Sequence, residues 1–336
     1  MTTHEYWLER ARQNEARTYE QKERAIKELQ KAFLEAEDTV VARIESFYRK
    51  YGVEGKVNEA DARKRLTATE LAEMRKRFHQ LQLRASSESN AQEMYRLQAK
   101  RYISRQEALL AEIRYYITEL ASVTDATVEQ VLTKIFEDQE LHSLYDIEQG
   151  LGYEVMFNRM SDDQLKTILL NGYDGRSFSS KIWYDRDTLA MNLTRLIPQQ
   201  FIAGVPTQVL ADKLSKVMKT SYNNAVRLIR TEGTYASAKA DMYTYQQCGC
   251  EMYEILATLD ARTSEICREM DGKVFPVSQA SVGVNMPPFH PNCRTTTLPV
   301  IDMDDIEEVR LAKDEDGKYI RVPKQSYRQW EASKAR

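Results

Sequence analysis

The sequence predicts a mostly α-helical chain with an α+β C-terminal domain: an elongated N-terminal helical bundle followed by a small sheet-containing domain. Neither glycine nor proline occurs between Lys56 and Gln149, and all eight prolines fall at or after Pro198. Apolar residues recur at three- and four-residue steps through the first half of the chain, which is typical of helices. We therefore expect an elongated helical domain over residues 1–149, an α+β domain over 150–300 and a C-terminal tail over 301–336.

The first predicted helix runs from about Glu5 to Tyr51, where Gly52 ends it. Its apolar stripe consists of Ile26, Leu29, Phe33, Val40, Ile44, Phe47 and Tyr51. The stripe predicts a bundle helix from Ile26 onward. The polar start, from Glu5 to Lys22, is instead a candidate arm that docks on a partner.

Further helices follow in the N-terminal half. Thr67 and Glu70 have the spacing of a capping box, so a second helix begins there. A break is expected at Ser86–Asn90 and another at Ser122–Asp125. These breaks separate the second helix from a third, between Met94 and Leu120, and from a fourth, between Val128 and Phe136.

The predicted second domain combines helices with a small sheet. Helices are expected over Asp187–Gln200, from Thr207 as N-cap, and over Ser221–Tyr245. Strands are expected over Tyr253–Leu259 and Lys273–Val277, with a short helical turn carrying Cys267 between them. The tail begins with an acidic run from Asp302 to Glu308, continues through a hairpin turn at Asp316-Gly317, and ends in an aromatic segment that either folds back or presents a docking patch.

Two basic triplets interrupt the helical half, Arg63-Lys64-Arg65 and Arg75-Lys76-Arg77. If one helix held both, they would face the same side, because eleven residues make three turns plus about 20°. Such a face can contact DNA phosphates without reading sequence, or it can simply be a solvated helix surface. The triplets are therefore DNA-binding candidates.

The densest chemistry lies between Leu256 and Pro299, which hold two of the four cysteines, one of the four histidines and five of the eight prolines. Cys267, His290 and Cys293 are candidate ligands of a structural Zn²⁺, with Asp260 as a possible fourth ligand and Cys248 or Cys250 as substitutes. His290 and Cys293 are three residues apart, a spacing that places both on one ion. The alternative is a proline-braced corner in which these side chains only pack and hydrogen-bond.

Catalysis is the other chemistry that these residue types permit. Cys267, His290 and Asp260 match a thiol nucleophile, a base and an orienting group, but the surrounding sequence matches no nucleophile motif, so we expect no enzyme. Charged residues nearby are expected to form a partly buried ion-pair network that joins helix to sheet. Its predicted members are Arg230, Glu232, Asp260, Arg262 and Arg294.

Composition excludes several other classes. The net charge of −3 is not that of a polybasic nucleic-acid binder, and no glycine-rich phosphate loop is present. The charged N-terminus lacks the apolar core of a signal peptide, and no apolar run reaches the roughly 18–20 residues of a membrane span. Four cysteines without the spacing of a disulfide framework suit a reducing compartment. We expect an intracellular protein that does not contact membranes.

Two ordered motifs carry a resemblance to a known family. DARTSEICREMDGKVF, from Asp260, and GVNMPPFHPNCR, from Gly283, resemble the C-terminal signature of phage minor head proteins, the head-morphogenesis (Mu F-like) family. The segments YW at the start, GRSFSSKIW, RLIRTE and a terminal YRQW extend the resemblance over nearly the whole chain. One departure is that many members carry cysteine where this chain has Ser264 and Thr295.

The resemblance implies a low-copy component of the procapsid and virion head. Its implied partners are the portal protein, scaffold or major capsid protein, and phage DNA bound weakly and without sequence preference, in support of head morphogenesis and DNA exit. The implied location is inside the head, after assembly in the host cytoplasm. Beyond one candidate structural Zn²⁺, no cofactor is expected. The alternatives are a non-specific DNA-binding accessory protein and a toxin-like enzyme built on the same C-terminal domain.

Overall fold

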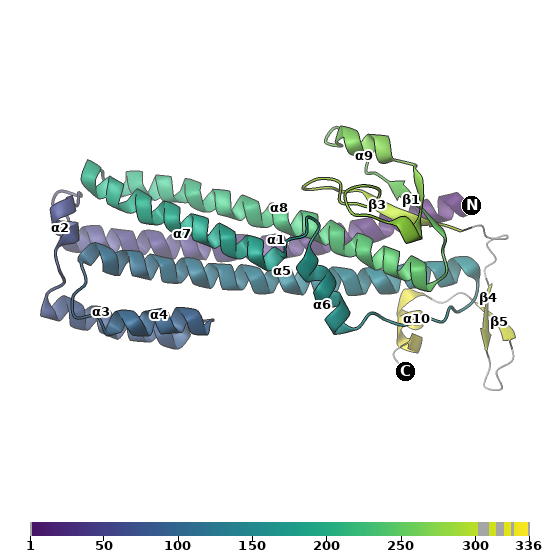
Figure 1. Cartoon of the computed structure of the whole chain (residues 1–336), viewed down its shortest axis with the longest axis horizontal. Helices are drawn as coiled ribbons and strands as arrows, with labels where there is room; N and C mark the ends of the chain where they lie inside the picture. The colour runs from purple at the N-terminus through teal and green to yellow at the C-terminus, as the bar shows by residue number, and fades with distance from the viewer. Residues whose placement is uncertain (1, 302–308, 314–318, 324–325, 335–336) are drawn as a thin grey trace. The chain divides into compact units, whose positions relative to one another are not determined.

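A computed structural model describes residues 2–301, 309–313, 319–323 and 326–334 (Figure 1). The elements follow in the order α1 (Thr3–Tyr51), α2 (Glu59–Arg63), α3 (Ala68–Arg84), α4 (Glu88–Gln98), α5 (Arg105–Leu151), α6 (Asp162–Asn171), α7 (Phe178–Ala203), α8 (Thr207–Gln247), β1 (Met252–Leu256), α9 (Glu265–Met270), β2 (Val274–Pro276), η1 (Val277–Gln279), β3 (Thr296–Val300), β4 (Val309–Lys313), β5 (Tyr319–Pro323) and α10 (Tyr327–Lys334).

The predicted fold class is confirmed. Long helices make up most of the chain, and β2, β1 and β3 form a small antiparallel sheet in that order. The chain divides into two compact units, and each draws on separate segments. Unit 1 comprises Met1–Ala25, Val128–Phe178 and Arg227–Arg336, and unit 2 comprises Ile26–Thr127 and Ser179–Val226. The domain limits at residues 149 and 300 stay a prediction. The contacts between residues group the chain differently, since α1, α5 and α8 each contribute to both units.

Unit 2 has an apolar interior that follows the predicted stripe of α1. Leu29, Val40 and Ile44 are buried there. Phe33 meets the ring of Tyr222 edge-on at 5.6 Å between centroids, and Phe47 stacks on Phe201 at 5.3 Å. Aromatic pairs at such distances add to the stabilisation from burial alone. The prediction of a bundle helix from Ile26 onward is confirmed.

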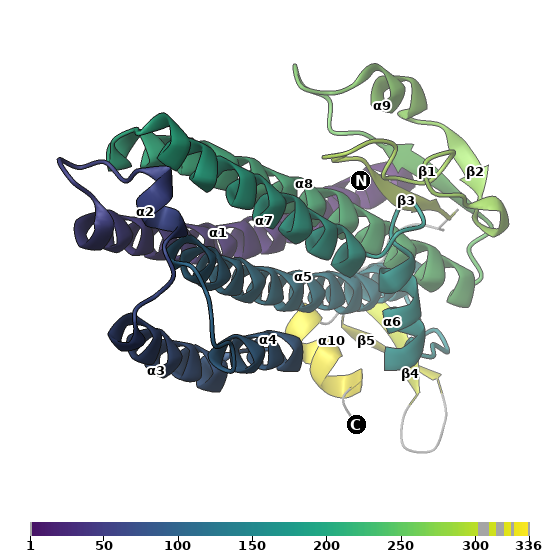
Figure 2. The same cartoon turned by 60° about the vertical axis from the view of Figure 1, so that its left-hand side comes forward.

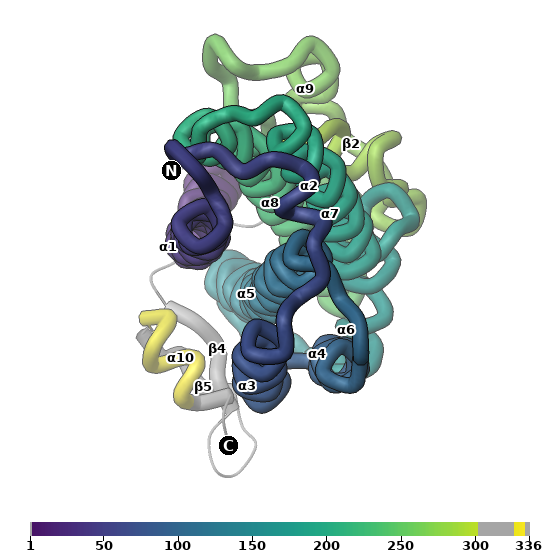
Figure 3. Tube along the Cα trace, turned by 90° about the vertical axis from the view of Figure 1, so that its left-hand side faces the viewer, coloured from purple at the N-terminus to yellow at the C-terminus, as the bar shows by residue number. Residues whose placement is uncertain are grey.

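Helices α3 and α4 lie side by side within unit 2 (Figure 3). The predicted capping box starts α3, because Thr67 accepts from the backbone N–H of Glu70 and the Glu70 carboxylate accepts from that of Thr67. Ser87 caps α4, so the predicted break at Ser86–Asn90 is present. The two helices share a core made of Met74, Phe78, Leu81, Met94 and Leu97.

Two predicted helix breaks were wrong. Helix α5 continues through Ser122–Asp125, where the Ser122 hydroxyl donates to the carbonyl of Thr118 and the Thr124 hydroxyl to that of Leu120. Helix α8 likewise runs unbroken through Ser221, and Thr207 is its first residue rather than its cap. Hydroxyl side chains satisfied by the carbonyl four residues back remain compatible with a helix, so a cluster of them is a weak stop signal. The break lies instead between α4 and α5.

In unit 1 the small sheet packs against the C-terminal part of α8 (Figure 2). Tyr253 and Ile255 on β1 and Leu298 on β3 are buried. They share one apolar cluster with Met242 and Tyr245 of α8. The strands alternate buried and partly exposed positions, so one face of the sheet is covered by the helix.

The start of α1 is part of this unit, and its interpretation as a free arm was wrong. Tyr6 and Trp7 are buried, and the Tyr6 hydroxyl donates to the carbonyl of Asp146 at 2.8 Å. The stripe that continues from them is polar: Asn14 donates to the Asp146 carboxylate at 3.0 Å, and Lys22 to the Thr234 hydroxyl at 2.9 Å. A buried stripe of polar residues does not show in hydrophobic periodicity.

The aromatic end of the tail folds back on unit 1. Trp330 on α10 is fully buried, and its indole N–H donates to the Glu148 carboxylate at 2.6 Å. Tyr327 stacks on His142 with 3.7 Å between ring centroids. Strands β4 and β5 pair antiparallel. The acidic run Asp302–Glu308 and the turn at Asp316-Gly317 lie outside the described residues. Among the described residues, no helix is both long and apolar enough to cross a membrane.

Candidate metal centre

Two segments of unit 1 bring the predicted ligands together. Cys267 lies in the first turn of α9, whose N-cap Ser264 accepts from the Cys267 backbone N–H at 3.4 Å. His290 and Cys293 lie in the loop that leads into β3. That loop turns sharply because the Cys293 N–H donates to the His290 carbonyl at 3.2 Å and Asn292 adopts a φ of 62°. Asparagine is one of the few residues that tolerate this left-handed conformation.

The three candidate ligand atoms lie within 4.8 Å of one another. The Cys267 sulfur is 3.1 Å from His290 Nε2 and 3.7 Å from the Cys293 sulfur. His290 Nδ1 lies 2.8 Å from the carbonyl oxygen of Pro291, which can only accept. Nδ1 therefore donates to this carbonyl, and Nε2, on the side of the two sulfurs, is the ring nitrogen left to bind a metal ion.

The two thiols differ in acidity. The pKa of Cys267 is lowered to about 4, first by the hydrogen bond from the Cys293 thiol and further by Ser264, Thr295 and His290, against the effect of burial. The pKa of Cys293 is raised well above its usual value by donating that hydrogen bond and by burial. Cys267 is thus the thiolate of the pair, and a thiolate is the form that binds metals.

Helix α8 supports the loop from beneath. The Thr234 hydroxyl donates to the Cys293 carbonyl at 2.8 Å, and the Asn292 N–H donates to the Thr231 hydroxyl at 3.0 Å. Lys22 reaches the same Thr234 across Gly233, where an added Cβ would lie 2.6 Å from the lysine Cε. Burial lowers the pKa of Lys22 to about 8. The loop is therefore held by α8, and α8 in turn by the start of α1.

Asp260 lies outside this group of ligand atoms. Its two carboxylate oxygens accept from the Arg294 guanidinium at 2.6 and 2.7 Å, and Arg262 lies 3.6 Å away. These contacts hold the pKa of Asp260 far below its usual range. Because His290 Nδ1 bonds to Pro291, Asp260 does not orient the imidazole either. Cys248 and Cys250 follow the end of α8 and are not members of the group.

The predicted charged network is divided rather than continuous. Asp260, Arg262 and Arg294 form one part of it. Arg230 pairs with Glu23 of α1 at 2.8 Å, and buried Glu232 accepts from the backbone N–H of Tyr173 at 3.2 Å. The ion pairs thus join α8 to α1 and to the segment after α6, as well as bracing the loop before β3.

The basic triplets do not share a helix, so the expected common face was wrong. Arg63 ends α2, whereas Arg75, Lys76 and Arg77 belong to α3. Most of their charges already have partners: Arg63 pairs with Glu59, Lys64 with Asp61, and Arg77 with Glu112, while Arg75 donates to the carbonyls of Gln98 and Lys100 and Arg65 lies over the Tyr102 ring. The non-helical residues between the end of α2 at Arg63 and the start of α3 at Ala68 separate the triplets.

The donor set and spacing of the cysteine–histidine group suit a metal ion. Two sulfurs bound to one tetrahedral Zn²⁺ at about 2.3 Å each are about 3.8 Å apart. The observed separation is 3.7 Å. The hydrogen bond from Nδ1 to Pro291 is the kind of outer contact that orients a ligating histidine. The Cys267–His290–Cys293 group can therefore hold a metal ion.

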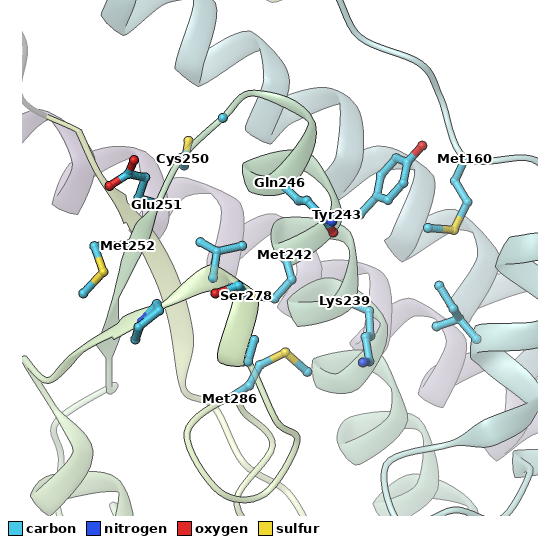
Figure 4. A pocket seen from close by; sticks show the side chains of 15 residues that line it. Met160, Lys239, Met242, Tyr243, Gln246, Cys250, Glu251, Met252, Ser278 and Met286 are labelled. Atoms are coloured by element: carbon cyan, nitrogen blue, oxygen red, sulfur yellow. The ribbon is translucent and has the colours of Figure 1, made fainter.

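A separate cavity of about 790 Å³ lies beside α8 and the sheet (Figure 4). Lys239, Met242, Tyr243 and Gln246 line it from one face of α8, and Met160, Met252 and Met286 contribute from other segments. Its volume is typical of small-molecule pockets, and methionine linings are adaptable. Sequence reasoning missed it; the spacing of the four α8 residues was the available signal. The loop Met286–Phe289, whose aromatic and proline residues would suit an exposed docking surface, is largely buried because Met286 joins the core of the sheet.

A protein-family model matches a stretch of the chain that runs from the last segment of unit 2 into unit 1. Residues 191–298 match the model of the family described as Phage Mu protein F like protein. Minor head protein GP7 of Bacillus phage SPP1 is 28% identical over 226 residues, which cover 62% of this chain and 73% of that protein. The NAD(+)–arginine ADP-ribosyltransferase EFV of Enterococcus faecalis (strain ATCC 700802 / V583) is 25% identical over 265 residues, covering 70% of this chain and 54% of that protein. The chain thus spans about half the length of the latter relative. No solved structure matches.

Proposed function

We propose that this chain, a member of the Mu F-like phage minor head protein family, is a low-copy component of a phage head that contacts the portal protein. The observation that carries the proposal is the family match over residues 191–298, the region that also contains the cysteine–histidine group. In the same proposal, the chain lies inside the head, contacts scaffold or major capsid protein, and contributes to DNA exit.

Helix α7, which enters the matched region at Met191, offers an exposed apolar surface for such a contact. Tyr184, Met191 and Ile202 on α7 are 75%, 65% and 60% exposed. Their spacings of 7 and 11 residues place all three on one face of the helix. Aligned apolar side chains left in solvent are typical of interaction surfaces.

The test is co-elution of the purified chain with the portal oligomer at physiological salt. We expect one complex with the unaltered chain and at least tenfold weaker binding when Met191 and Ile202 are both changed to glutamate. The matched control is Leu83→Glu on α3, an equally exposed leucine outside the family match, which should leave binding intact. If the unaltered chain and portal elute separately, the proposed portal contact is lost.

DNA contact, in our proposal, is weak, non-specific and dependent on salt. Its support is the pair of basic triplets, although several of their charges are already balanced by acids of the same chain. Changing all six triplet residues to glutamine should make the salt dependence of DNA binding shallower. An unchanged slope would remove the triplets from the interface. The alternative of a DNA-binding accessory protein is less favoured because the family match points elsewhere and acids of the same chain already balance several of the triplet charges.

The group Cys267–His290–Cys293 is, we propose, a structural Zn²⁺ site that fixes the loop before β3 onto α9. Its support is the sulfur separation and the oriented imidazole. Zinc supplies cross-linking of segments that are distant in sequence. Metal analysis of the purified chain should give about one zinc ion per chain, and His290→Ala should abolish it. A chain purified without chelator that contains no zinc would leave the packed-corner alternative.

An enzymatic role is the second candidate, since one relative is named an NAD(+)–arginine ADP-ribosyltransferase. We propose that this chain lacks that activity, because it spans only about half of that relative and because its family match is to phage head proteins. Incubation with labelled NAD⁺ and an arginine-bearing acceptor should give no transfer above heat-inactivated protein. Transfer above that level would favour the toxin-like alternative.

A further inference from the structure

We propose that the metal site has three protein ligands and that its fourth coordination position lies beside Ser264, where an exchangeable water completes the tetrahedron. This inference rests on the proposed zinc site and specifies its coordination. The side of the ion that faces Ser264 is then open. The ion would be exchanged from that side, and a further ligand would have to replace the water there.

The spacing of the chain places Ser264 among the ligand positions. Ser264 and Cys267 are separated by two residues, as are His290 and Cys293. Structural zinc sites commonly combine two such short pairs from separate segments. In this chain the pairs come from the N-terminus of α9 and from the loop before β3, and three of the four positions carry ligand side chains. Ser264 occupies the remaining position.

The contacts of Ser264 place its hydroxyl next to the ligand atoms. The Ser264 hydroxyl oxygen is 2.8 Å from His290 Nε2, the nitrogen that faces the sulfurs. The same hydroxyl lies close enough to the Cys267 side chain to lower its pKa. It thus touches two of the three ligand side chains, as an atom at the fourth corner of the tetrahedron would. Two neighbouring ligand atoms on one zinc ion are about 3.3–3.8 Å apart, so a small separation of these groups would admit the ion.

The side chains near the fourth position do not themselves bind zinc. Zinc in proteins takes thiolate, imidazole or carboxylate ligands, and a serine hydroxyl is not among them. Ser264 also caps α9 by accepting from the Cys267 N–H, which uses part of its acceptor capacity. The nearest charged candidate, Asp260, is held by Arg294. A water hydrogen-bonded to Ser264 is therefore the fourth ligand, and in this respect the site differs from closed structural zinc sites, in which four side chains bind the ion.

Thr295 provides the matched comparison. Its hydroxyl hydrogen-bonds to the side chains of both Cys267 and Cys293, and the residue is buried. It follows Cys293 by only two positions, which is shorter than the usual ligand spacing. The structure therefore gives Thr295 the role of a hydrogen-bond donor to sulfur, whereas Ser264 stands at the open coordination position.

The experiment is titration of the full, metal-free chain with Co²⁺, which reports thiolate ligands by sulfur-to-cobalt absorption. The unaltered chain should bind one ion with the absorption of two thiolates. Ser264→Cys should bind at least tenfold more tightly and raise that absorption by about half, because a third thiolate replaces water. Thr295→Cys, which adds a cysteine on the other side of the sulfur pair, should give neither gain.

The cobalt titrations distinguish the position of the open site from the existence of the zinc site. Tighter binding by Thr295→Cys but not by Ser264→Cys would place the open position at residue 295 and overturn the inference. If the cobalt complex of the unaltered chain already shows the absorption of three thiolates, the inference is overturned as well, since another cysteine would then fill the fourth position. No binding by any of the three proteins would reject the zinc site itself. Portal co-elution is measured separately, so the minor head proposal does not depend on these outcomes.

Discussion

Unit 2 is held together mainly by apolar side chains, whereas unit 1 buries charged and polar groups throughout its interior. In unit 2, residues such as Leu29 and Phe78 fill the core. The buried carboxylate Glu112 lies there between two guanidiniums, at 2.6 Å from Arg43 and 2.8 Å from Arg77. The buried carboxylates of unit 1 are Glu140, Asp146, Glu148, Glu232 and Asp241.

The acids of unit 1 are satisfied mostly by neutral donors. Asp241 accepts from Gln139 and Ser143 of α5 and from Thr297 of β3. Burial raises its pKa to about 7, and burial likewise raises the pKa of Asp146 to about 6 in spite of Arg10. Directional bonds of this kind specify how helices and sheet meet, at a cost in desolvation. We therefore expect unit 1 to respond to pH and metal, and unit 2 to respond to neither.

The largest expected effect is that of Trp330→Ala. It removes a fully buried indole and the donor to Glu148, so we expect a loss of about 3–5 kcal/mol in the free energy of unfolding of unit 1. Hydrogen exchange should rise in α10 and in the part of α5 that it covers, and remain slow in α3 and α4. Faster exchange in both units alike would mean that they unfold together.

Removing the metal should have the next largest effect. With free zinc a hundredfold above its dissociation constant, binding stabilises the folded state by about 2.7 kcal/mol. A chelator should lower the melting temperature and deprotect α9 and the loop 290–295, with α3 and α4 as the internal control. Cys267→Ser should behave as the chelated protein does, and adding chelator to it should change nothing further.

Between pH 7 and pH 5 the Asp241 carboxyl should contribute stability to chelated unit 1, while the lowered pKa values of His142 and Cys267 act in the opposite direction. The folded state raises the Asp241 pKa from 3.8 to about 7, so it binds a proton that the unfolded chain has released. That contribution is fully present below about pH 4 and is lost as the pH rises through 7; between pH 5 and 7 it changes by about 2 kcal/mol.

Asp241→Asn should remove this contribution, so that on going from pH 7 to 5 the variant gains less stability, or loses more, than the unaltered chain. An amide does not titrate, and the Thr297 hydroxyl can rotate to accept from it. Urea denaturation across the pH range measures both proteins. A variant that keeps the full slope would assign the dependence to other groups, such as Asp146.

The smallest expected effect lies in unit 2. Thr67→Ala removes the hydroxyl half of the capping box of α3 and should cost about 1 kcal/mol. Thr67→Ser, which keeps the hydroxyl, is the matched control and should cost less than half of that. Denaturation of unit 2 should show the difference at any pH between 5 and 7, since the hydroxyl does not titrate there. A pH-dependent loss would weaken the contrast between the units.

The sequence by itself determined the helical half, its apolar stripe and the capping box of α3, because these depend on residues three or four positions apart. It also predicted Cys267, His290 and Cys293 as candidate metal ligands, with Asp260 as a possible fourth. Cys267 lies in a helical turn, and His290 and Cys293 are three apart, so local geometry already limits where their side chains go.

Only the tertiary structure decided that the polar start of α1 is buried and that two supposed breaks are continuous helix. Asn14 and Lys22 resemble surface residues until Asp146 and Thr234, more than a hundred positions away, supply their partners. Likewise Asp260 was a reasonable ligand until Arg294 occupied both of its oxygens. A hydrophobic pattern shows which side of a helix is buried among apolar groups, but the partner of a polar group depends on which distant segment the fold brings within about 3 Å.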